Sequence, residues 1–333
     1  MPARTLSVSL LVLLFCSFAV QAEPTVETVL EGLNNPVAVV LQPETGVLFV
    51  SESGAGQVVR VIDGKSEVVI SGFPIDQYGE GPKFAIGPLG LAFIGKNILA
   101  VGGGGLADGE ELLRIYNVPA EGSIEASEMA ASFTLGPVGD VAGEGNFYGL
   151  AIVAGSLFVT GNGDDTKGWI AHAPVKGITV GPLQRGIATK EAVGLDAPVA
   201  LAVAPDGSLV VGQMGEVKTP GDSALSFYDP RSGKLLANFK TGLHDISGLA
   251  YGPDGMLYAT DFSWLDAGQG SLSRLVAVRG ETLNVKARKL LSLERPTAIT
   301  FAPDGEAYVT VIGPGAAAGE KATGKLLKIR LEP

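Results

Sequence analysis

A short strand–turn–strand unit recurs along this chain, and its clearest copy spans residues 245–261. In that copy a Pro253-Asp254-Gly255 turn joins two segments of apolar and β-favouring residues. Proline presets φ at the first corner, aspartate bonds its own backbone, and glycine accepts a positive φ. The sequence therefore predicts a tight hairpin at this point and a fold assembled from copies of it.

The copies align on a small residue early in each first strand, and successive copies are roughly 50 residues apart, each with about four short predicted strands. Innermost propeller strands converge on one axis, where a bulky side chain would collide with its neighbours. A β-sandwich or solenoid is the alternative, but neither requires such an anchor. We therefore predict an all-β, six-bladed β-propeller with four-stranded antiparallel blades. The anchors are Ala38, Gly90, Gly149, Ala200, Gly248 and Ala298.

The sixth repeat has three predicted strands before the chain ends, whereas an unassigned apolar segment, Val26 to Leu30, stands near the N-terminus. We expect this segment to supply the outer strand of the last blade. Closing the ring in this way removes open sheet edges, which otherwise invite aggregation.

The first 22 residues have the pattern of a signal peptide. Arg4 precedes an apolar stretch too short to span a bilayer, and Val20-Gln21-Ala22 is a small-x-small cleavage site. The sequence thus predicts export to the periplasm or the exterior and one propeller domain over residues 23–333. The single cysteine, Cys16, lies within the predicted leader, so the mature chain would form no disulfide.

The chain is acidic, with 35 Asp and Glu residues against 24 Lys and Arg and a formal net charge of −11. Such a balance repels nucleic acid and anionic lipid, and no basic cluster offsets it. After the leader no stretch of about 18 apolar residues follows, so we expect no membrane insertion.

The segment Gly-Leu-Ala-x-Gly-Pro-Asp-Gly-x-Leu-Tyr-Ala-x-Asp at 248–261 resembles the six-bladed propellers of the NHL-repeat, SMP-30/gluconolactonase and strictosidine-synthase-like group. Gly32-Leu33-Asn34-Asn35-Pro36, with residues 196–212 and 242–261, is similar more particularly to the ScyD/ScyE family of secreted bacterial propellers. That family is associated with scytonemin biosynthesis clusters, and the resemblance carries over no defined activity.

The lactonase branch of this group implies a divalent metal on the propeller axis, held by carboxylates and amides that directly precede the anchors. Hard oxygen ligands of that kind suit Ca²⁺. None of the corresponding residues here is a carboxylate or an amide, so we expect neither a metal nor a cofactor. These positions are Val37, Leu89, Tyr148, Val199, Ser247 and Thr297.

Candidates for acid–base chemistry are few. His244 and Asp245 stand just before an inner strand, and Glu80 lies in the longest predicted loop, residues 71–88. His172 falls in a predicted third strand, where we expect a structural role. No Gly-x-Ser-x-Gly elbow is present, so the sequence names no serine nucleophile.

The loops that precede the inner strands should gather on one face, where propellers commonly bind ligands. Their mixed charge and two tyrosines suit a small polar ligand or a peptide. The leading hypothesis is therefore a ligand-binding or protein-binding module. The alternative is a metal-independent hydrolase or a tailoring enzyme of the SMP-30 or ScyD/ScyE type that uses His244, Asp245 and Glu80. The predicted ligand-binding residues are Tyr78, Glu80, Lys83, Asn146, Tyr148, Asp245 and Arg295.

Overall fold

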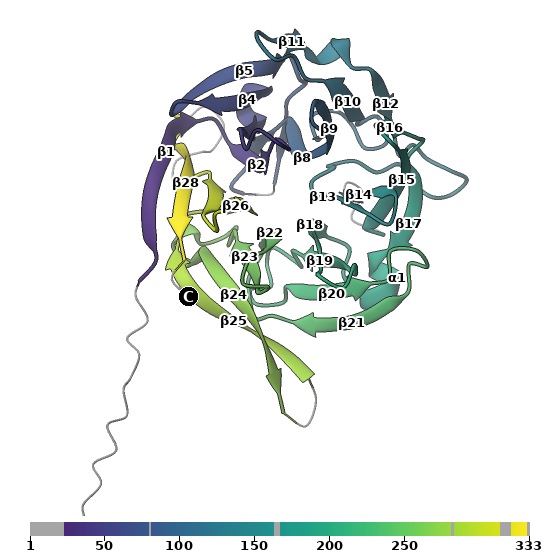
Figure 1. The fold of residues 1–333 in the computed structure, drawn as a ribbon. Helices are drawn as coiled ribbons and strands as arrows, with labels where there is room; N and C mark the ends of the chain where they lie inside the picture. Colours follow the sequence, from purple (N-terminus) through teal and green to yellow (C-terminus); the bar gives the residue numbers. More distant parts are fainter. Residues whose placement is uncertain (1–22, 80, 163–166, 281–282, 314–320, 332–333) are drawn as a thin grey trace, which may run out of the picture.

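The structure is a computed structural model that describes residues 23–79, 81–162, 167–280, 283–313 and 321–331. Six antiparallel sheets stand around a common axis, each with its first strand innermost (Figure 1). The predicted six-bladed β-propeller is confirmed. One short helix, α1 (Thr189–Val193), lies in the described part of the chain.

Blades 1 and 3 carry a fifth short strand in addition to the four-strand pattern, whereas blade 2 has four strands. Blade 1 is β2 (Pro36–Leu41), β3 (Leu48–Glu52), β4 (Gln57–Ile62) and β5 (Lys65–Ser71), with β11 (Ile124–Glu125) parallel to β5. Blade 2 is β8 (Pro88–Gly95), β9 (Ile98–Gly103), β10 (Leu113–Asn117) and β12 (Ala131–Phe133). Blade 3 is β13 (Leu150–Val153), β14 (Ser156–Gly161) and β15 (Trp169–Lys176), which pairs with both β16 (Thr179–Val180) and β17 (Gln184–Ala188).

The remaining blades are regular. Blade 4 is β18 (Pro198–Val203), β19 (Leu209–Gln213), β20 (Ala224–Tyr228) and β21 (Leu235–Lys240). Blade 5 is β22 (Ile246–Tyr251), β23 (Leu257–Asp261), β24 (Ser271–Arg279) and β25 (Leu283–Ser292). Blade 6 is β26 (Pro296–Phe301), β27 (Ala307–Val311), β28 (Gly324–Arg330) and β1 (Thr25–Leu33).

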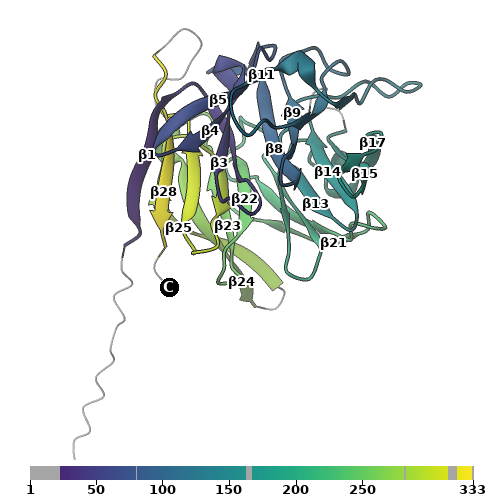
Figure 2. The same ribbon diagram turned by 45° about the horizontal axis from the view of Figure 1, so that its top comes forward.

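The N-terminal strand closes the ring as predicted. Strand β1 pairs antiparallel with β28, placing Val26 opposite Ile329 and Leu30 opposite Leu326. The two strands lie side by side at the outer edge of blade 6 (Figures 1 and 2). Because Leu30 and Leu326 are both buried, the seam between the chain ends is an apolar contact as well as a ladder of hydrogen bonds.

Three anchor glycines are explained by crowding between adjacent inner strands. A Cβ at Gly90 would lie 2.2 Å from the carbonyl oxygen of Tyr148, and one at Gly149 would lie 2.3 Å from that of Val199. A Cβ at Gly248 would lie 2.9 Å from the Cα of Ala298. Each contact is with the inner strand of the next blade or the residues that lead into it, so the backbone itself leaves no room for a side chain.

Buried hydroxyls tie neighbouring blades together near the axis. Ser51 Oγ of blade 1 donates to the carbonyl of Leu89 at 2.7 Å, and Thr160 Oγ1 of blade 3 donates to that of Val199 at 2.9 Å. Thr297 Oγ1 of blade 6 donates to the carbonyl of Pro36 at 2.8 Å, which joins the last blade to the first. Each bond gives an inner-strand carbonyl a hydrogen-bond donor from the neighbouring blade.

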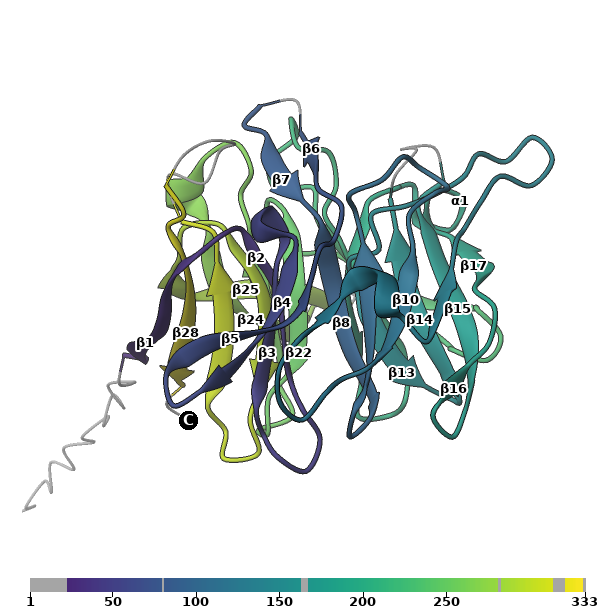
Figure 3. The same cartoon turned by 90° about the horizontal axis from the view of Figure 1, so that it is seen from above.

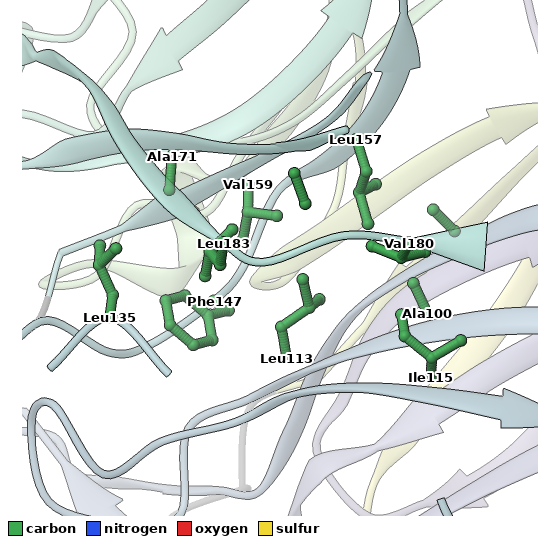
Figure 4. Close-up of a cluster of buried hydrophobic side chains, with 12 residues drawn as sticks. Ala100, Leu113, Ile115, Leu135, Phe147, Leu157, Val159, Ala171, Val180 and Leu183 are labelled. Atoms are coloured by element: carbon green, nitrogen blue, oxygen red, sulfur yellow. The ribbon is translucent and has the colours of Figure 1, made fainter. Parts of the chain in front are cut away.

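The hydrophobic core is divided among the interfaces between blades rather than gathered at one centre. Between blades 2 and 3, for example, Leu113 and Ile115 face Leu157 and Val159 around the ring of Phe147 (Figure 4). All five side chains are buried. Each blade is therefore held chiefly by its two neighbours, as expected of a repeat architecture.

The backbone is crowded where blades 2 and 3 meet. The first strand of blade 3 begins at Leu150, because Phe147 makes its backbone hydrogen bonds with Gly90 and Gly103 of blade 2. The glycines around residue 102 pack tightly at this junction. A Cβ at Gly102 would lie 2.0 Å from the carbonyl oxygen of Phe147.

Among the helices that the structure describes, none has the length and apolar character needed to cross a membrane.

Candidate functional site

A pocket opens on the axis where the inner strands begin. It holds about 600 Å³ of open space, including the solvent at its mouth. All six blades contribute to its lining, and blade 5 does so through Phe262 and Trp264, which follow its second strand. Most of its lining is apolar, and the described lining residues include no Asp, Glu, His, Lys, Arg, Ser or Cys. These residues are Asn35, Val37, Tyr78, Phe84, Ala85, Ile86, Leu89, Asn146, Tyr148, Asn162, Val199, Met214, Phe262, Trp264, Thr297 and Ile312.

A two-stranded hairpin stands over the pocket. Strands β6 (Asp76–Tyr78) and β7 (Phe84–Ile86) project from the ring at the end where the pocket opens (Figure 3). This hairpin belongs to the long segment that the sequence predicted as a loop. Residues from both of its strands line the pocket, so it forms part of the wall.

An aromatic cluster fixes the hairpin to blade 5. Phe84 packs edge-on against Phe262 and Trp264, with ring centroids 5.5 and 5.1 Å away. Tyr78 packs edge-on against Trp264 at 5.9 Å, and Trp264 Nε1 donates to the carbonyl of Pro82 at 3.1 Å. Edge-to-face pairs of this kind add to the stabilisation from buried area. The pocket therefore has a preformed aromatic wall.

Three polar groups in the lining make no hydrogen bond to the described protein: the amides of Asn146 and Asn162 and the hydroxyl of Tyr148. Burial raises the pKa of Tyr148 above its ordinary value of 10.0, so its phenol is a neutral donor. These groups can hydrogen-bond to a ligand, because each retains unused donor or acceptor capacity. The pocket thus offers a few directional contacts within an apolar enclosure.

The backbone that carries Asn146 is held in an unusual conformation. Its φ of 48° lies in the left-handed region, which asparagine tolerates better than most residues. The backbone N–H of Asn146 donates to the carboxyl group of Glu111, which is buried. Burial raises the pKa of Glu111 to about 8. The buried carboxyl group of Glu111 thus positions one of the pocket's polar residues.

The predicted acid–base pair lies beside the pocket rather than in its lining. Asp245 is buried, and its carboxyl group accepts the backbone N–H of Trp264, while burial raises its pKa to about 6. His244 Nδ1 lies 3.4 Å from Ser263 Oγ and 3.8 Å from a carboxylate oxygen of Asp261. In this arrangement Asp245 supports the aromatic wall through the backbone of Trp264.

The seven predicted ligand-binding residues separate into groups. Tyr78, Asn146 and Tyr148 line the pocket. Arg295 lies against the hairpin, with its guanidinium carbon 5.4 Å from the centre of the Phe84 ring. Lys83 is exposed on the hairpin, Asp245 lies behind Trp264, and Glu80 falls outside the described residues.

The sequence missed the aromatic and aliphatic part of the lining. Phe84, Phe262 and Trp264 meet only because the 71–88 segment folds back as a hairpin against blade 5. A signal was nevertheless present: five of the six positions that precede the anchors line the pocket. These are Val37, Leu89, Tyr148, Val199 and Thr297.

The polar residues at the ends of the second strands have different roles. Glu52 accepts the backbone N–H of Asn34 at 2.8 Å, and Asp261 accepts that of Asp245 at 2.7 Å. Both carboxylates therefore brace the segment that leads into the inner strand of their own blade. Asn162 lines the pocket, and Gln213 is buried with no hydrogen-bond partner among the described residues.

Comparison with known proteins gives a structural likeness and no sequence relative. No protein-family model and no curated protein matches the sequence. The fold is similar to that of the soluble aldose sugar dehydrogenase of Escherichia coli, with a TM-score of 0.60 and 14% identity over 93% of this chain and 100% of that one. It is also similar to the PQQ-bound aldose sugar dehydrogenase of Streptomyces coelicolor, with a TM-score of 0.57 and 18% identity over 93% and 99% of the chains.

A third similar structure is a gluconolactonase of Xanthomonas campestris, with a TM-score of 0.53 and 13% identity over 92% of this chain and 89% of that one. The chain is thus a six-bladed β-propeller whose structural neighbours belong to the SMP-30/gluconolactonase and PQQ-type sugar dehydrogenase group. At these identities the likeness concerns the fold, and function has to be argued from the site.

The described lining residues fit neither a divalent cation nor PQQ, the two bound groups that such neighbours suggest. A divalent cation on the axis needs several oxygen ligands, yet Val37, Leu89 and Val199 occupy positions from which they would come. No group of three or more His, Cys, Asp or Glu side chains within the described ranges could hold a metal ion. PQQ carries carboxylates, and the described lining offers no cationic side chain to pair with them.

Proposed function

We propose that the protein binds a neutral, largely apolar small molecule in the axial pocket. The observation that carries this proposal is the pocket's composition: an enclosure of aliphatic and aromatic side chains with a few free polar groups and no charge among its described residues. Apolar enclosures with a small number of placed polar groups are typical small-molecule sites. A sugar, with hydroxyls all round, would leave most of them without partners.

The amides of Asn146 and Asn162 and the phenol of Tyr148 define the ligand's polar end. Together they can donate and accept, which suits a carbonyl or hydroxyl group on an otherwise apolar body. The aromatic wall of Phe84, Phe262 and Trp264 suits a ring system, since edge-to-face and offset contacts favour flat ligands.

Trp264 provides a direct test, because the chain has two tryptophans and only this one lines the pocket. N-phenyl-1-naphthylamine, a neutral aromatic probe, should bind saturably and quench Trp264 emission in a Trp169→Phe background. Val199→Phe should fill the pocket and abolish the signal.

Val138→Phe makes the same substitution at a side chain that is 65% exposed, and it should leave binding unchanged. Saturable binding that survives in Val199→Phe would place the probe elsewhere and contradict the proposal. Absence of saturable binding in the unsubstituted protein would contradict it equally.

The second candidate is an enzyme, either a metal-independent hydrolase or a tailoring enzyme like those associated with the ScyD/ScyE family. The observation that favours it is that the structural neighbours are named as dehydrogenases and a lactonase. Screening lactones and esters would test it: turnover lost in Asp245→Asn but kept in Asp63→Asn, an exposed turn residue, would support catalysis. Equal turnover in both variants would remove Asp245 from consideration.

Two further parts of the proposal rest on the sequence. The signal-peptide pattern of residues 1–22 supports export, and N-terminal sequencing of the purified extracellular or periplasmic protein tests it. A peptide or protein partner on the same loop face is the other form of the binding hypothesis. Such a partner would compete with N-phenyl-1-naphthylamine if it inserts a side chain into the pocket.

A further inference from the structure

The free polar groups of the axial pocket all come from one part of the ring. The three lining residues whose side chains make no hydrogen bond to the described chain, Asn146, Tyr148 and Asn162, belong to blade 3 or to the segment that leads into it. The aromatic wall comes instead from blade 5 and the β6–β7 hairpin. The pocket therefore has a polar side and an apolar side, which would give a bound ligand a defined orientation.

Two other polar residues of the lining already make hydrogen bonds within the protein. Asn35 Nδ2 donates to the carbonyl of Ala85 at 3.2 Å and so ties blade 1 to the hairpin. Thr297 Oγ1 donates to the carbonyl of Pro36 at 2.8 Å. The capacity that remains for a ligand is therefore concentrated on the blade 3 side.

The two asparagines on that side are held by the same stretch of backbone. The N–H of Asn162 donates to the carbonyl of Gly145 at 3.2 Å, directly before Asn146. The N–H of Asn146 donates to the carboxyl group of Glu111, and its φ is 48°. Both side chains are buried and both line the pocket. Two amides thus enter the pocket from neighbouring, fixed backbone positions.

The amide of Asn146 is also confined by blade 2. A Cβ at Gly104 would lie 3.2 Å from Asn146 Oδ1 and 2.4 Å from Leu89 Cδ1, and both of these side chains line the pocket. Glycine at this position leaves the space that the two side chains occupy. A polar group confined in this way is preorganised, since it loses little freedom when a ligand binds.

Amide chemistry restricts what can satisfy these groups. A primary amide presents an N–H donor beside a carbonyl acceptor in one plane. Its best single partner has an acceptor and a donor on adjacent atoms, as when asparagine pairs bidentately with adenine. A ketone, an ether or a lactone only accepts, so it would leave the amide oxygens without a donor, which costs free energy in an enclosed site.

We propose that the ligand of the axial pocket is a flat heterocycle that carries an N–H directly beside a carbonyl, the edge of a lactam. This inference rests on the proposed function and narrows it. The lactam edge faces Asn146 and Asn162, the Tyr148 hydroxyl adds a donor for the carbonyl, and the ring lies against Phe262 and Trp264. A lactone of the same shape is rejected because it lacks the donor.

Three bicyclic compounds of nearly the same shape test the proposal by isothermal titration calorimetry. 2-Quinolinone has the N–H beside the carbonyl, coumarin has an oxygen in place of the N–H, and 2-naphthol has a single hydroxyl. 2-Quinolinone should bind about tenfold or more tightly than coumarin, as expected when a buried acceptor is left without its donor.

Substitution of either asparagine should remove this preference. Asn162→Leu replaces one amide by an apolar group of similar size and should reduce the preference to about twofold or less. Asn146→Gly should act in the same direction, because glycine keeps the left-handed backbone while the amide is lost. Asn284→Leu makes the first change at an exposed asparagine of β25 and should keep the parent's preference. All three variants should still bind N-phenyl-1-naphthylamine, which shows that the pocket is intact.

Several results would contradict the lactam inference alone. These are equal affinity for 2-quinolinone and coumarin, 2-naphthol binding as tightly as 2-quinolinone, no binding of 2-quinolinone, or a preference that survives in both Asn162→Leu and Asn146→Gly. If N-phenyl-1-naphthylamine still binds saturably in these cases, the proposed function stands. A parent protein that binds none of the four compounds would contradict both.

Discussion

The axial pocket and the hollow between blades 3 and 4, near the β13–β14 and β20–β21 turns, lie in the same ring and differ in composition. The pocket gathers side chains from around the ring and has an uncharged described lining, whereas the hollow draws on two adjacent blades and includes His172 and the exposed Arg231. Position in the fold accounts for the difference. Burial on the axis makes a charge costly, while the rim leaves a charged head in contact with water.

The two hollows also differ in how their walls are held. The pocket is braced by buried carboxyl groups that accept backbone N–H groups, Glu111 for Asn146 and Asp245 for Trp264. The hollow between blades 3 and 4 is bounded by the β20–β21 turn, which Asp229 holds by accepting the backbone N–H groups of Arg231 and Ser232.

The largest expected effect comes from removing the aromatic wall. Trp264→Ala should lower the free energy of unfolding by about 3–5 kcal/mol, the usual cost of a large buried truncation. It should abolish binding of N-phenyl-1-naphthylamine. Chemical denaturation and the probe-binding assay check this. Unchanged probe affinity in a folded Trp264→Ala protein would show that the aromatic wall does not form the site.

The next effect concerns pH. Glu111 has a raised pKa of about 8 in the folded protein, against 4.5 as its ordinary value. Between these values the folded state holds a proton that the unfolded state has released, so stability is full below about pH 4.5 and declines as the pH rises toward 8. Glu111→Gln should remove this decline, raising the free energy of unfolding at pH 8 by on the order of a few kcal/mol relative to the parent.

Denaturation of both proteins at several pH values checks this prediction. Glu67→Gln, at an exposed carboxylate of blade 1, is the matched control and should keep the parent's pH dependence. Parallel pH profiles for Glu111→Gln and the parent would show that Glu111 ionises normally.

A smaller effect is expected at the ties between blades. Ser51→Ala removes the buried bond to the Leu89 carbonyl and leaves that carbonyl without its partner, at a cost of about 1–3 kcal/mol. Since Leu89 lines the axial pocket, affinity for N-phenyl-1-naphthylamine should fall. Ser66→Ala, at an exposed serine on β5, should change neither quantity. Unaltered stability in Ser51→Ala would show that the tie contributes little.

The smallest effect is expected for Arg231→Gln. This side chain is exposed, so its replacement should change the free energy of unfolding by less than about 0.5 kcal/mol. Thermal denaturation checks this prediction, and a shift of several degrees would mean that Arg231 has a structural role.

The repeat pattern predicted the ring because its cause is local and recurs in every copy. Gly90, Gly149 and Gly248 are small because the neighbouring backbone leaves no space, and that constraint is visible in one sequence. The closure by β1 followed from a count of strands. Crowding at the axis and the number of strands follow from the repeat pattern, so they can be predicted without knowing which side chains touch.

The sites were harder to predict because they depend on contacts between distant segments. Trp264 contacts Pro82 and Phe84 only when the 71–88 segment folds back across the ring, and no periodicity in the sequence predicts that contact. The hollow between blades 3 and 4 likewise brings His172 of β15 near the β20–β21 turn of another blade. Conversely, Tyr78, Asn146 and Tyr148 were found because they stand near or at the starts of inner strands, where the topology converges.

Strands β1 and β28 are far apart in the sequence, yet they form one antiparallel pair at the outer edge of blade 6. During synthesis β1 leaves the ribosome early, and its hydrogen-bonding edge stays unpaired until β28 has been made. The ring therefore closes only when blade 6 is available. Removal of β1 from the folded protein should loosen blade 6, whose other three strands follow all the remaining blades in the sequence.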